Sequence, residues 1–298
     1  MENKNLILSG RYEILDTLGH GNDGIVYLVR HQSLEMNRAL KLFPKKGAPS
    51  LFAISEAKIL KTVQHPGIPT IYDFEEDESF FYLVEEYIQG VSLEEFLLHQ
   101  QSISQNLFFN FCEQLCDIFA YLHTLCPNPI VYQDLKPEHI IVCELQIKLI
   151  DFSVASFIAN SGNDFNHLGN HAFSAPELSL NEPITPVSDI YSIGKIIDFM
   201  LPFVNAPLSR NILYITQKAT NPEPMFRYQT VYELSDALNK TKESLGKTHL
   251  LQKIAVIGSH SGCGCTHSNI PSLHAELSRS SRCVSGRKLD QLSEKSTA

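Results

Sequence analysis

Residues 130–153 constrain this chain most, because they place two aspartates and a lysine at the ends of two short apolar runs. The runs are Ile140–Val142 and Ile147–Ile150. Each is bounded by polar residues, as short buried strands are, so we predict a small hairpin. Asp134 and Lys136 precede the first run, and Asp151 follows the second. One carboxylate can accept a proton from a hydroxyl, the other can hold a divalent cation, and the lysine can neutralise a migrating phosphoryl group. The alternative is a pair of surface aspartates in turns beside strand ends.

The composition excludes several classes of protein. A chain of 298 residues can form one large or two modest domains. Its net charge of −9 argues against nucleic-acid or anionic-membrane partners. No apolar run reaches the ~18 residues of a membrane span, and the first residues lack a secretory signal. The seven cysteines are odd in number and irregularly spaced, unlike a disulfide framework. We therefore expect a reduced, cytoplasmic protein.

A glycine-rich hairpin is predicted near the N-terminus. From Tyr12 the sequence alternates apolar and polar residues on both sides of Gly19, Gly21 and Gly24. Glycines let a backbone approach phosphates closely and present its N–H groups to them. Dinucleotide-binding proteins share this pattern, but they begin a helix after the glycines, whereas a strand, Ile25–Val29, is predicted here.

The next strand carries a lysine among apolar neighbours. In the sequence RALKLF, Ala39 and Lys41 are predicted on the buried side. A lysine there needs an anionic partner, or it must extend to water as on an edge strand. Ser50 is predicted to cap a helix over Leu51–Val63, which places Glu56 facing Lys41.

The remaining pattern changes from strands to helices. Strands are predicted near Ile68–Phe74 and Phe80–Glu86, followed by helices over Ser92–Leu98 and Asn106–Leu125. The change indicates a boundary between two lobes near Ile88–Gly90.

A series of motifs between Tyr12 and Lys240 resembles the protein kinase superfamily, and within it the bacterial serine/threonine kinases. In order they are LGHGNDGIV, RALKLF, Glu56, LVEEYIQG, VYQDLKPEH, IDFS, SAPEL, DIYSIG and PMFRY. The resemblance implies an α+β fold of two lobes: a small antiparallel β lobe with one helix, and a larger, mostly helical lobe. The expected divisions are an extension at 1–11, a kinase domain at 12–245 (lobes 12–88 and 89–245) and a tail at 246–298.

The resemblance also implies an activity, transfer of the γ-phosphate of ATP to serine or threonine hydroxyls of a protein substrate. Asp134 would accept the hydroxyl proton, with Lys136 near the γ-phosphate. Lys41, paired with Glu56, would hold the α- and β-phosphates, and Asp151 would chelate Mg²⁺. Residues expected to contact ATP are Leu18, Gly19, Gly21, Gly24, Val26, Ala39, Lys41 and Ile141, with backbone groups of Glu86 and Ile88. No nucleic acid or membrane partner is expected.

Two further features follow from the resemblance and concern the helical lobe. Glu177 and Arg227 match a buried ion pair that braces this lobe. Asp189, in DIYSIG, would fix the backbone of the loop that carries Asp134.

Five residues depart from the family pattern. His139 replaces the asparagine of a second metal site, and since imidazole suits softer ions than Mg²⁺, Mn²⁺ becomes a candidate. Ser153 replaces a glycine, Tyr132 replaces a histidine whose packing role an aromatic ring can fill, and Gln133 replaces an arginine that could clamp a phosphorylated loop. Glu85, behind the adenine position, would narrow the pocket or find a polar partner. These departures leave open an active kinase, a pseudokinase that binds nucleotide or acts as a scaffold, and a small-molecule kinase.

The tail loosely resembles the start of a deviant P-loop ATPase. The sequence LQKIAVIGSHSGCGCTH predicts a strand, a glycine-rich turn and then Thr266. Cys265 stands where that motif has lysine, and Gly258 lies one residue too far from Gly264. We expect a truncated P-loop fragment followed by disorder; a docking segment and a working nucleotide site are the alternatives.

Overall fold

The computed structural model describes residues 6–8, 10–20, 24–47, 49–158, 172–180, 182–205 and 210–258, with backbone alone for 6–7 and 246–258. By its internal contacts the chain divides into two compact units, Met1–Leu245 and Gly246–Ala298. The architecture described below is that of the first unit.

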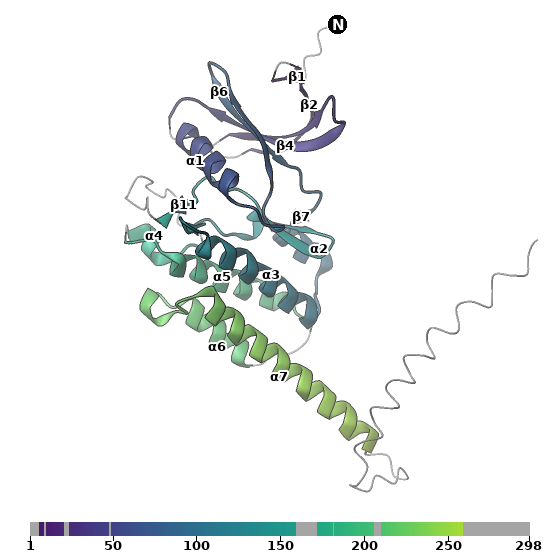
Figure 1. Ribbon diagram of the computed structural model, residues 1–298. Coiled ribbons are helices and arrows are strands. Elements are labelled where there is room, and N and C mark those ends of the chain that lie inside the picture. Colours follow the sequence, from purple (N-terminus) through teal and green to yellow (C-terminus); the bar gives the residue numbers. More distant parts are fainter. Residues whose placement is uncertain are drawn as a thin grey trace, which may run out of the picture. The chain divides into compact units, whose positions relative to one another are not determined.

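The N-terminal part of this unit is an antiparallel sheet (Figure 1). Its strand order is β1-β2-β3-β4-β6-β5. The strands are β1 (Leu6–Ile7), β2 (Tyr12–His20), β3 (Ile25–His31), β4 (Met36–Pro44), β5 (Ile71–Glu76) and β6 (Phe80–Glu86). The predicted glycine hairpin is β2–β3, in which Gly19 lies opposite Val26. The short strand β1 had no signal in the sequence.

The two faces of this sheet bury different kinds of residue. In the pairing of β4 with β6, Leu40 lies opposite Val84, and both belong to a small apolar core with Tyr12 and Val29. Because successive side chains of a strand alternate between faces, Lys41 points to the other face, where helix α1 (Pro49–Thr62) packs.

The start of α1 differs from the prediction. Ser50 does not cap the helix but lies within its first turn, where its hydroxyl donates to Gly47 O at 2.8 Å. The physical reason is Pro49, whose fixed φ suits the first helical position and starts the helix before Ser50.

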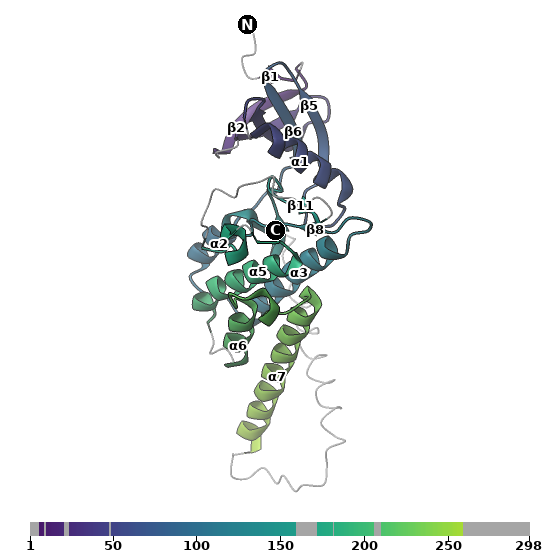
Figure 2. The same cartoon turned by 90° about the vertical axis from the view of Figure 1, so that its left-hand side faces the viewer.

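The rest of the unit is mostly helical. Its helices are α2 (Leu93–Gln100), α3 (Gln105–Thr124), α4 (Pro176–Leu180), α5 (Pro186–Met200), α6 (Arg210–Ala219) and α7 (Val231–Gly258), with short 3₁₀ turns at Pro137–His139, Leu201–Phe203 and Pro224–Phe226. Side-chain caps begin three of them, from Ser92, Ser104 and Thr185. Helices α3 and α5 lie side by side (Figures 1 and 2). Leu115, Phe119 and Leu122 of α3, spaced three and four apart, are fully buried in the main core.

The predicted hairpin at 140–150 is confirmed. Strands β9 (Ile140–Cys143) and β10 (Gln146–Leu149) pair antiparallel, with Val142 opposite Ile147. Strand β7 (Val91–Ser92) joins this hairpin, and β8 (Ile130–Val131) pairs with β11 (Ser156–Phe157). These small sheets hold the segments that carry Asp134 and Asp151.

The strand predicted from Leu251 is wrong, because helix α7 continues through Gly258. Leucine, glutamine, lysine and alanine in this stretch favour a helix, and neither glycine nor proline occurs between Leu251 and Gly258. The segment therefore lacks the strand that a P-loop requires. Gly262, Gly264 and Thr266 lie outside the described residues. Among the described helices, none is both long and apolar enough to cross a membrane.

Candidate active site

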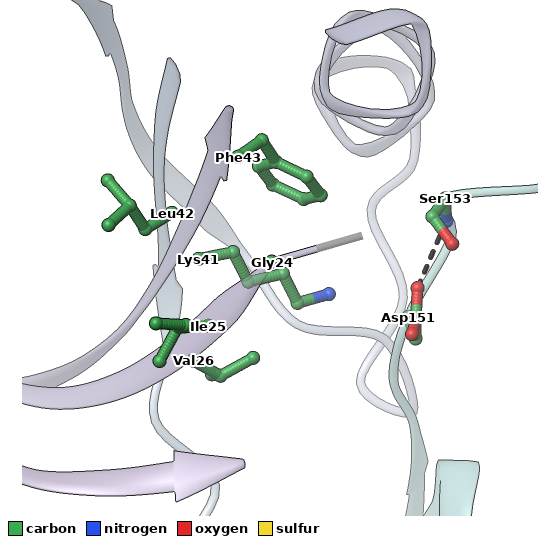
Figure 3. Close-up of a pocket in the computed structure, with 8 residues that line it drawn as sticks. All are labelled: Gly24, Ile25, Val26, Lys41, Leu42, Phe43, Asp151 and Ser153. Atoms are coloured by element: carbon green, nitrogen blue, oxygen red, sulfur yellow. Dashed lines mark hydrogen bonds between the residues drawn. The ribbon is translucent and has the colours of Figure 1, made fainter. Parts of the chain in front are cut away.

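A cleft lies between the N-terminal sheet and the segment that follows β10 (Figure 3). It encloses about 360 Å³, counting the solvent-filled space at its open mouth. Its lining residues are Gly24, Ile25, Val26, Lys41, Leu42 and Phe43 on one side and Asp151 and Ser153 on the other. Lys41 extends from β4 toward the side that carries Asp151.

Lys41 is buried and paired, which excludes an edge-strand lysine in water. Its Nζ lies 2.5 Å from Glu56 Oε1 and 3.3 Å from Glu85 Oε1. Burial alone would lower the pKa of Lys41, but the nearby carboxylates of Glu56, Glu85 and Asp151 hold it above its ordinary value. The lysine is therefore charged and poised at the cleft.

Glu56 connects three elements of the structure. It is fully buried in α1, and its Oε1 accepts hydrogen bonds from Lys41 of β4 and from the Phe152 backbone N–H at 3.0 Å. The pKa of Glu56 is raised to about 7. Burial is the main cause, Asp151 and Glu85 act in the same direction, and Lys41 acts in the opposite direction. This side chain thereby fixes the lysine relative to the segment that begins at Asp151.

Asp151 presents a carboxylate to the cleft, with its side chain 34% exposed. Burial would raise its pKa, but the charge of Lys41 and hydrogen bonds from Ser153 outweigh burial and hold the pKa well below its usual range. One of those bonds comes from the Ser153 N–H at 3.2 Å, shown dashed in Figure 3. Serine in place of glycine thus leaves the carboxylate ionised. The backbone at Asp151 has a φ of 65°, an uncommon conformation held by these contacts.

The loop around Asp134 is fixed from the helical lobe. Asp189, fully buried in α5, accepts hydrogen bonds from the backbone N–H groups of Tyr132 and Gln133, each at 2.9 Å, as predicted. His123 Nε2 lies 2.8 Å from the same carboxylate, a contact that the sequence did not reveal. Within the loop, Lys136 Nζ lies 3.0 Å from Asp134 Oδ2.

Tyr132 and His139, two departures from the family pattern, contact each other. The Tyr132 hydroxyl donates to Ile150 O at 2.5 Å, so it can only accept from His139 Nδ1, 3.3 Å away. Asp134 O, 3.0 Å from Nδ1, is also an acceptor. The network therefore assigns the proton to Nδ1 and leaves a lone pair on Nε2, which faces Asp151 Oδ2 at 3.5 Å.

The metal ligands expected from the sequence fit only in part. The Asp151 carboxylate suits Mg²⁺, whereas the His139 imidazole beside it suits softer divalent ions. No cluster of three or more histidine, cysteine, aspartate or glutamate side chains that could hold a metal occurs among the described residues. Any metal here would need phosphate or water oxygens to complete its coordination.

Several residues predicted to contact ATP lie outside the lining of the cleft. Leu18 is 44% exposed on β2, and Ala39 is buried in β4. Ile88 and Ile141 are half-buried. The Glu86 N–H donates to Thr70 O at 2.9 Å, so of its backbone groups only the carbonyl remains for a ligand. Gly21 lies outside the described residues.

Gly24 has a reason for being glycine that the sequence did not suggest. A Cβ atom there would lie 2.1 Å from Leu42 O, so a side chain cannot fit against β4. At Gly19, by contrast, a Cβ would meet no atom within 4 Å. Strand packing, and not only close approach to phosphate, therefore requires one of the glycines.

The role of Glu85 was only partly foreseen. Of the two outcomes predicted for it, a polar partner is the one observed, and that partner is Lys41. The contact follows from the pairing of β4 with β6, which places Ala39 opposite Glu85, and nothing in the sequence predicted that register. The predicted pair of Glu177 and Arg227 is also observed, with both guanidinium nitrogens on the carboxylate at 2.6 and 2.8 Å.

Comparison with known proteins agrees with this geometry. Residues 12–255 match the family model described as the protein kinase domain. Serine/threonine-protein kinase PrkC of Bacillus subtilis is 27% identical over 76% of this chain and 40% of its own length. Death-associated protein kinase 2 of Mus musculus is 31% identical over 77% of this chain and 65% of its own length. The SNF-related serine/threonine-protein kinase of Rattus norvegicus is 30% identical over 70% of this chain and 29% of its own. The chain thus spans less than two thirds of each of these relatives.

Proposed function

Because this chain belongs to the protein kinase family, we propose that it transfers the γ-phosphoryl group of ATP to serine and threonine hydroxyls of a protein substrate. The observation that carries the proposal is the contact set of Lys41, Glu56 and Phe152, which holds a charged lysine opposite the Asp151 carboxylate. The names of the relatives, and the lysine in DLKPE, support a serine/threonine kinase. The likeness to the Bacillus subtilis protein supports the bacterial branch.

On the nucleotide side, Lys41 would bind phosphate oxygens at the cleft. A bound polyanion would lie against Gly24 and Val26, which line the cleft beside the lysine. A divalent ion at Asp151, when bound, would neutralise charge on the phosphates. We propose that Mg²⁺ is held there through the carboxylate and that Mn²⁺ is better accommodated beside His139 Nε2.

On the acceptor side, Asp134 would take the proton of the substrate hydroxyl. The oxygen of that hydroxyl would at the same time form a bond to the γ-phosphorus. The bond between that phosphorus and the bridging oxygen breaks, and ADP leaves. Lys136, 3.0 Å from the Asp134 carboxylate, would face the charge on the transferred group. Asp189 keeps the loop backbone in place during this transfer.

A second candidate, a pseudokinase that binds nucleotide or acts as a scaffold, is favoured by His139. This imidazole occupies the position of an oxygen ligand, so the second metal position is poorly suited to Mg²⁺. Gln133 binds Ser156 Oγ at 2.7 Å and carries no charge for a phosphorylated loop. Under this alternative the chain would bind nucleotide without transferring phosphate.

The discriminating experiment is incubation of the full chain with labelled ATP, Mg²⁺ or Mn²⁺ and a serine-rich protein. We expect incorporation into serine or threonine, and about a 100- to 10,000-fold loss in Asp134→Asn, because a general base contributes that much. Glu113→Gln, which removes a carboxylate from an exposed pair with Lys242, is the control and should match the wild type. Nucleotide binding by the wild type without any incorporation would favour the pseudokinase.

We also propose that residues 12–245 form one folding domain, with lobes 12–88 and 89–245, between an extension (1–11) and a tail (246–298). The division of contacts after Leu245 supports this. A soluble 12–245 fragment that binds nucleotide is the expected result; a fragment that does not fold would contradict it. The net charge of −9 supports a protein without nucleic-acid or membrane partners, which cosedimentation with anionic vesicles and a DNA-binding titration would test. The odd number and irregular spacing of the seven cysteines support a reduced, cytoplasmic protein.

A further inference from the structure

Glu85 lies beside Lys41 on one face of the N-terminal sheet. In the pairing of β4 with β6, Ala39 lies opposite Glu85 and Lys41 lies opposite Leu83. Opposed residues, and residues two apart along a strand, share a face, so the side chains of Ala39, Lys41 and Glu85 point the same way. Glu85 Oε1 lies 3.3 Å from Lys41 Nζ, while Glu56 Oε1 approaches the same nitrogen to 2.5 Å from α1. One ammonium therefore serves two carboxyl groups.

These two glutamates, the buried acidic pair, are short of hydrogen-bond donors. Glu56 is 0% exposed and Glu85 is 3% exposed. Among the described residues, their Oε2 atoms are the buried side-chain nitrogen and oxygen atoms that have no hydrogen-bond partner. A buried carboxylate oxygen without a donor is unfavourable, and a proton on it both removes the charge and satisfies the atom. A proton on one of the two glutamates is therefore favourable.

The charges around the pair come from every element packed against it. Burial raises the pKa of Glu85, Lys41 lowers it, and Asp151 and the neighbouring Glu86 raise it. Burial, with smaller contributions from Asp151 and Glu85 and opposed by Lys41, raises the pKa of Glu56 to about 7. Two acids that share one cation titrate together, so the pair keeps its first proton to a higher pH than an isolated glutamate does.

We propose that Glu85 is a positioning residue that competes with the nucleotide phosphates for Lys41, so that nucleotide binding is coupled to proton uptake by the buried acidic pair. This inference rests on the proposed function, because it requires phosphates at the cleft beside Lys41. In the free protein above neutral pH, both carboxylates are ionised and pair with Lys41. When the lysine binds phosphate, Glu85 loses that contact and takes a proton from solvent.

The direction of the pH dependence follows from the charges. Phosphates bring negative charge to the cleft and engage Lys41, so the acidic pair holds its proton more tightly with nucleotide bound than without. Below the pH at which the free protein gives up this proton, the pair carries it in both states, and affinity is constant. As pH rises above that value the free protein loses the proton first, so affinity falls, by up to about tenfold per pH unit for one linked proton.

The test is isothermal titration calorimetry of the full chain with ADP and saturating Mg²⁺, since ADP cannot transfer a phosphoryl group. Titrations at pH 6, 7 and 8, each in two buffers of different ionisation enthalpy, give affinity and protons taken up. In the wild type, affinity should fall about threefold to tenfold from pH 7 to 8, with net proton uptake at pH 8. Glu85→Gln, which keeps the shape and removes the carboxyl, should bind about threefold to tenfold more tightly than the wild type at pH 8 and take up fewer protons.

Two further variants make the result decisive. Glu85→Met should behave as Glu85→Gln does, and it decides the matter if the glutamine variant fails to fold in a thermal melt. Glu76→Gln removes a glutamate that also pairs with a lysine of this lobe, Lys45 at 3.0 Å, but Glu76 is 60% exposed. It should titrate as the wild type does. Titration of ADP itself is common to every variant and cancels in the comparison.

The outcomes separate this inference from the proposed function. Equal pH dependence and equal proton uptake in the wild type and both Glu85 variants would overturn the inference and leave nucleotide binding intact. Absence of ADP binding by the folded wild type at every pH would overturn the proposed function, and the inference with it.

Discussion

Among the described residues, the buried cluster around Arg227 and the buried cluster around Lys41 are built differently. In the helical lobe, Arg227 pairs with Glu177 through its two terminal guanidinium nitrogens, Nη1 and Nη2. The remaining guanidinium N–H groups donate to the backbone carbonyls of Asn221, Pro222 and Val187. That cluster is balanced in charge and saturated in hydrogen bonds.

The cluster at the cleft is neither balanced nor saturated. Lys41 faces both Glu56 and Glu85, and one oxygen of each carboxyl has no hydrogen-bond partner among the residues that the structure describes. Close by, Asp151 and His139 direct two lone-pair atoms at each other across 3.5 Å. A saturated cluster can only hold the fold together, whereas a surplus of acceptors can receive a proton, a metal ion or a ligand donor. The proposed function rests on the cluster that has this surplus of acceptors.

The strongest way to break this comparison is to replace each cation by methionine. Lys41→Met should reduce phosphoryl transfer by at least about 100- to 1,000-fold, because the charge acts on the phosphates. The fold should persist, because the two glutamates left behind can be protonated. Activity assays and thermal unfolding of the same preparation measure both effects. Activity of Lys41→Met near the wild-type level would contradict the active-kinase proposal.

Arg227→Met should do the opposite and cost stability. Removing the arginine leaves a buried carboxylate and three carbonyls without their donors, for a loss of about 3–5 kcal/mol. Chemical denaturation at pH 7 gives the value. The double variant Arg227→Met with Glu177→Leu should recover part of the loss, because no charge is left unpaired. A loss below ~1 kcal/mol in the single variant would show that the pair does not brace the lobe.

His139→Asn tests whether the surplus acceptors at the cleft select the metal. An amide oxygen in place of imidazole should strengthen Mg²⁺ at the expense of Mn²⁺, changing the ratio of rates with the two ions by about tenfold. Rates are measured for both proteins across a concentration series of each ion, with Glu113→Gln as the unaltered control. An unchanged ratio would mean that the ring turns away and water supplies the ligand.

The two clusters should also respond to pH with opposite signs. Burial raises the pKa of Glu56 to about 7, above its unfolded value, so the folded protein binds the extra proton and stability falls as pH rises from about 4.5 to 7. The pKa of Glu177 is lowered, since hydrogen bonds from Arg227 outweigh burial, so its stabilising contribution is present above the ordinary glutamate pKa and is lost as pH falls through the lowered value.

Thermal and chemical unfolding at pH 5 and 8 check these signs. Relative to the wild type, the free energy of unfolding of Glu85→Gln should be higher by about 1 kcal/mol more at pH 8 than at pH 5. The substitution removes a negative charge that is present at pH 8 and neutralised by a proton at pH 5. Glu177→Gln should be most destabilised at neutral pH, with the difference shrinking in acid. Equal differences at all pH values would contradict the contrast.

Much of this site could be predicted because its signals are local. The hairpin at 140–150 and the sheet hairpin around Gly19 and Gly24 follow from alternation and glycine. Lys41 needed a carboxylate because a buried ammonium does, and Glu56 sat at a suitable distance along the sequence. Such requirements belong to single residues, so a single sequence reveals them.

What the sequence did not reveal depends on register between distant segments. Glu85 reaches Lys41 only because β6 pairs with β4 at a particular alignment, and Tyr132 reaches His139 only through the turn of the loop. Two other differences from the prediction are local. They are the helix start at Pro49 and the helix in place of a strand at Leu251. Both depend on helix propensity, which hydrophobic periodicity alone does not reveal.

A single oxygen atom, Glu56 Oε1, receives both Lys41 Nζ and the Phe152 N–H. The oxygen belongs to α1, whereas the two donors belong to the sheet and to the segment that carries Asp151. A shift of α1 by about 1–2 Å would therefore loosen both bonds together. The helix exposes Leu51, 57% accessible, to solvent. A ligand that binds there and displaces the helix would change the contacts of Lys41 and Phe152 at the same time.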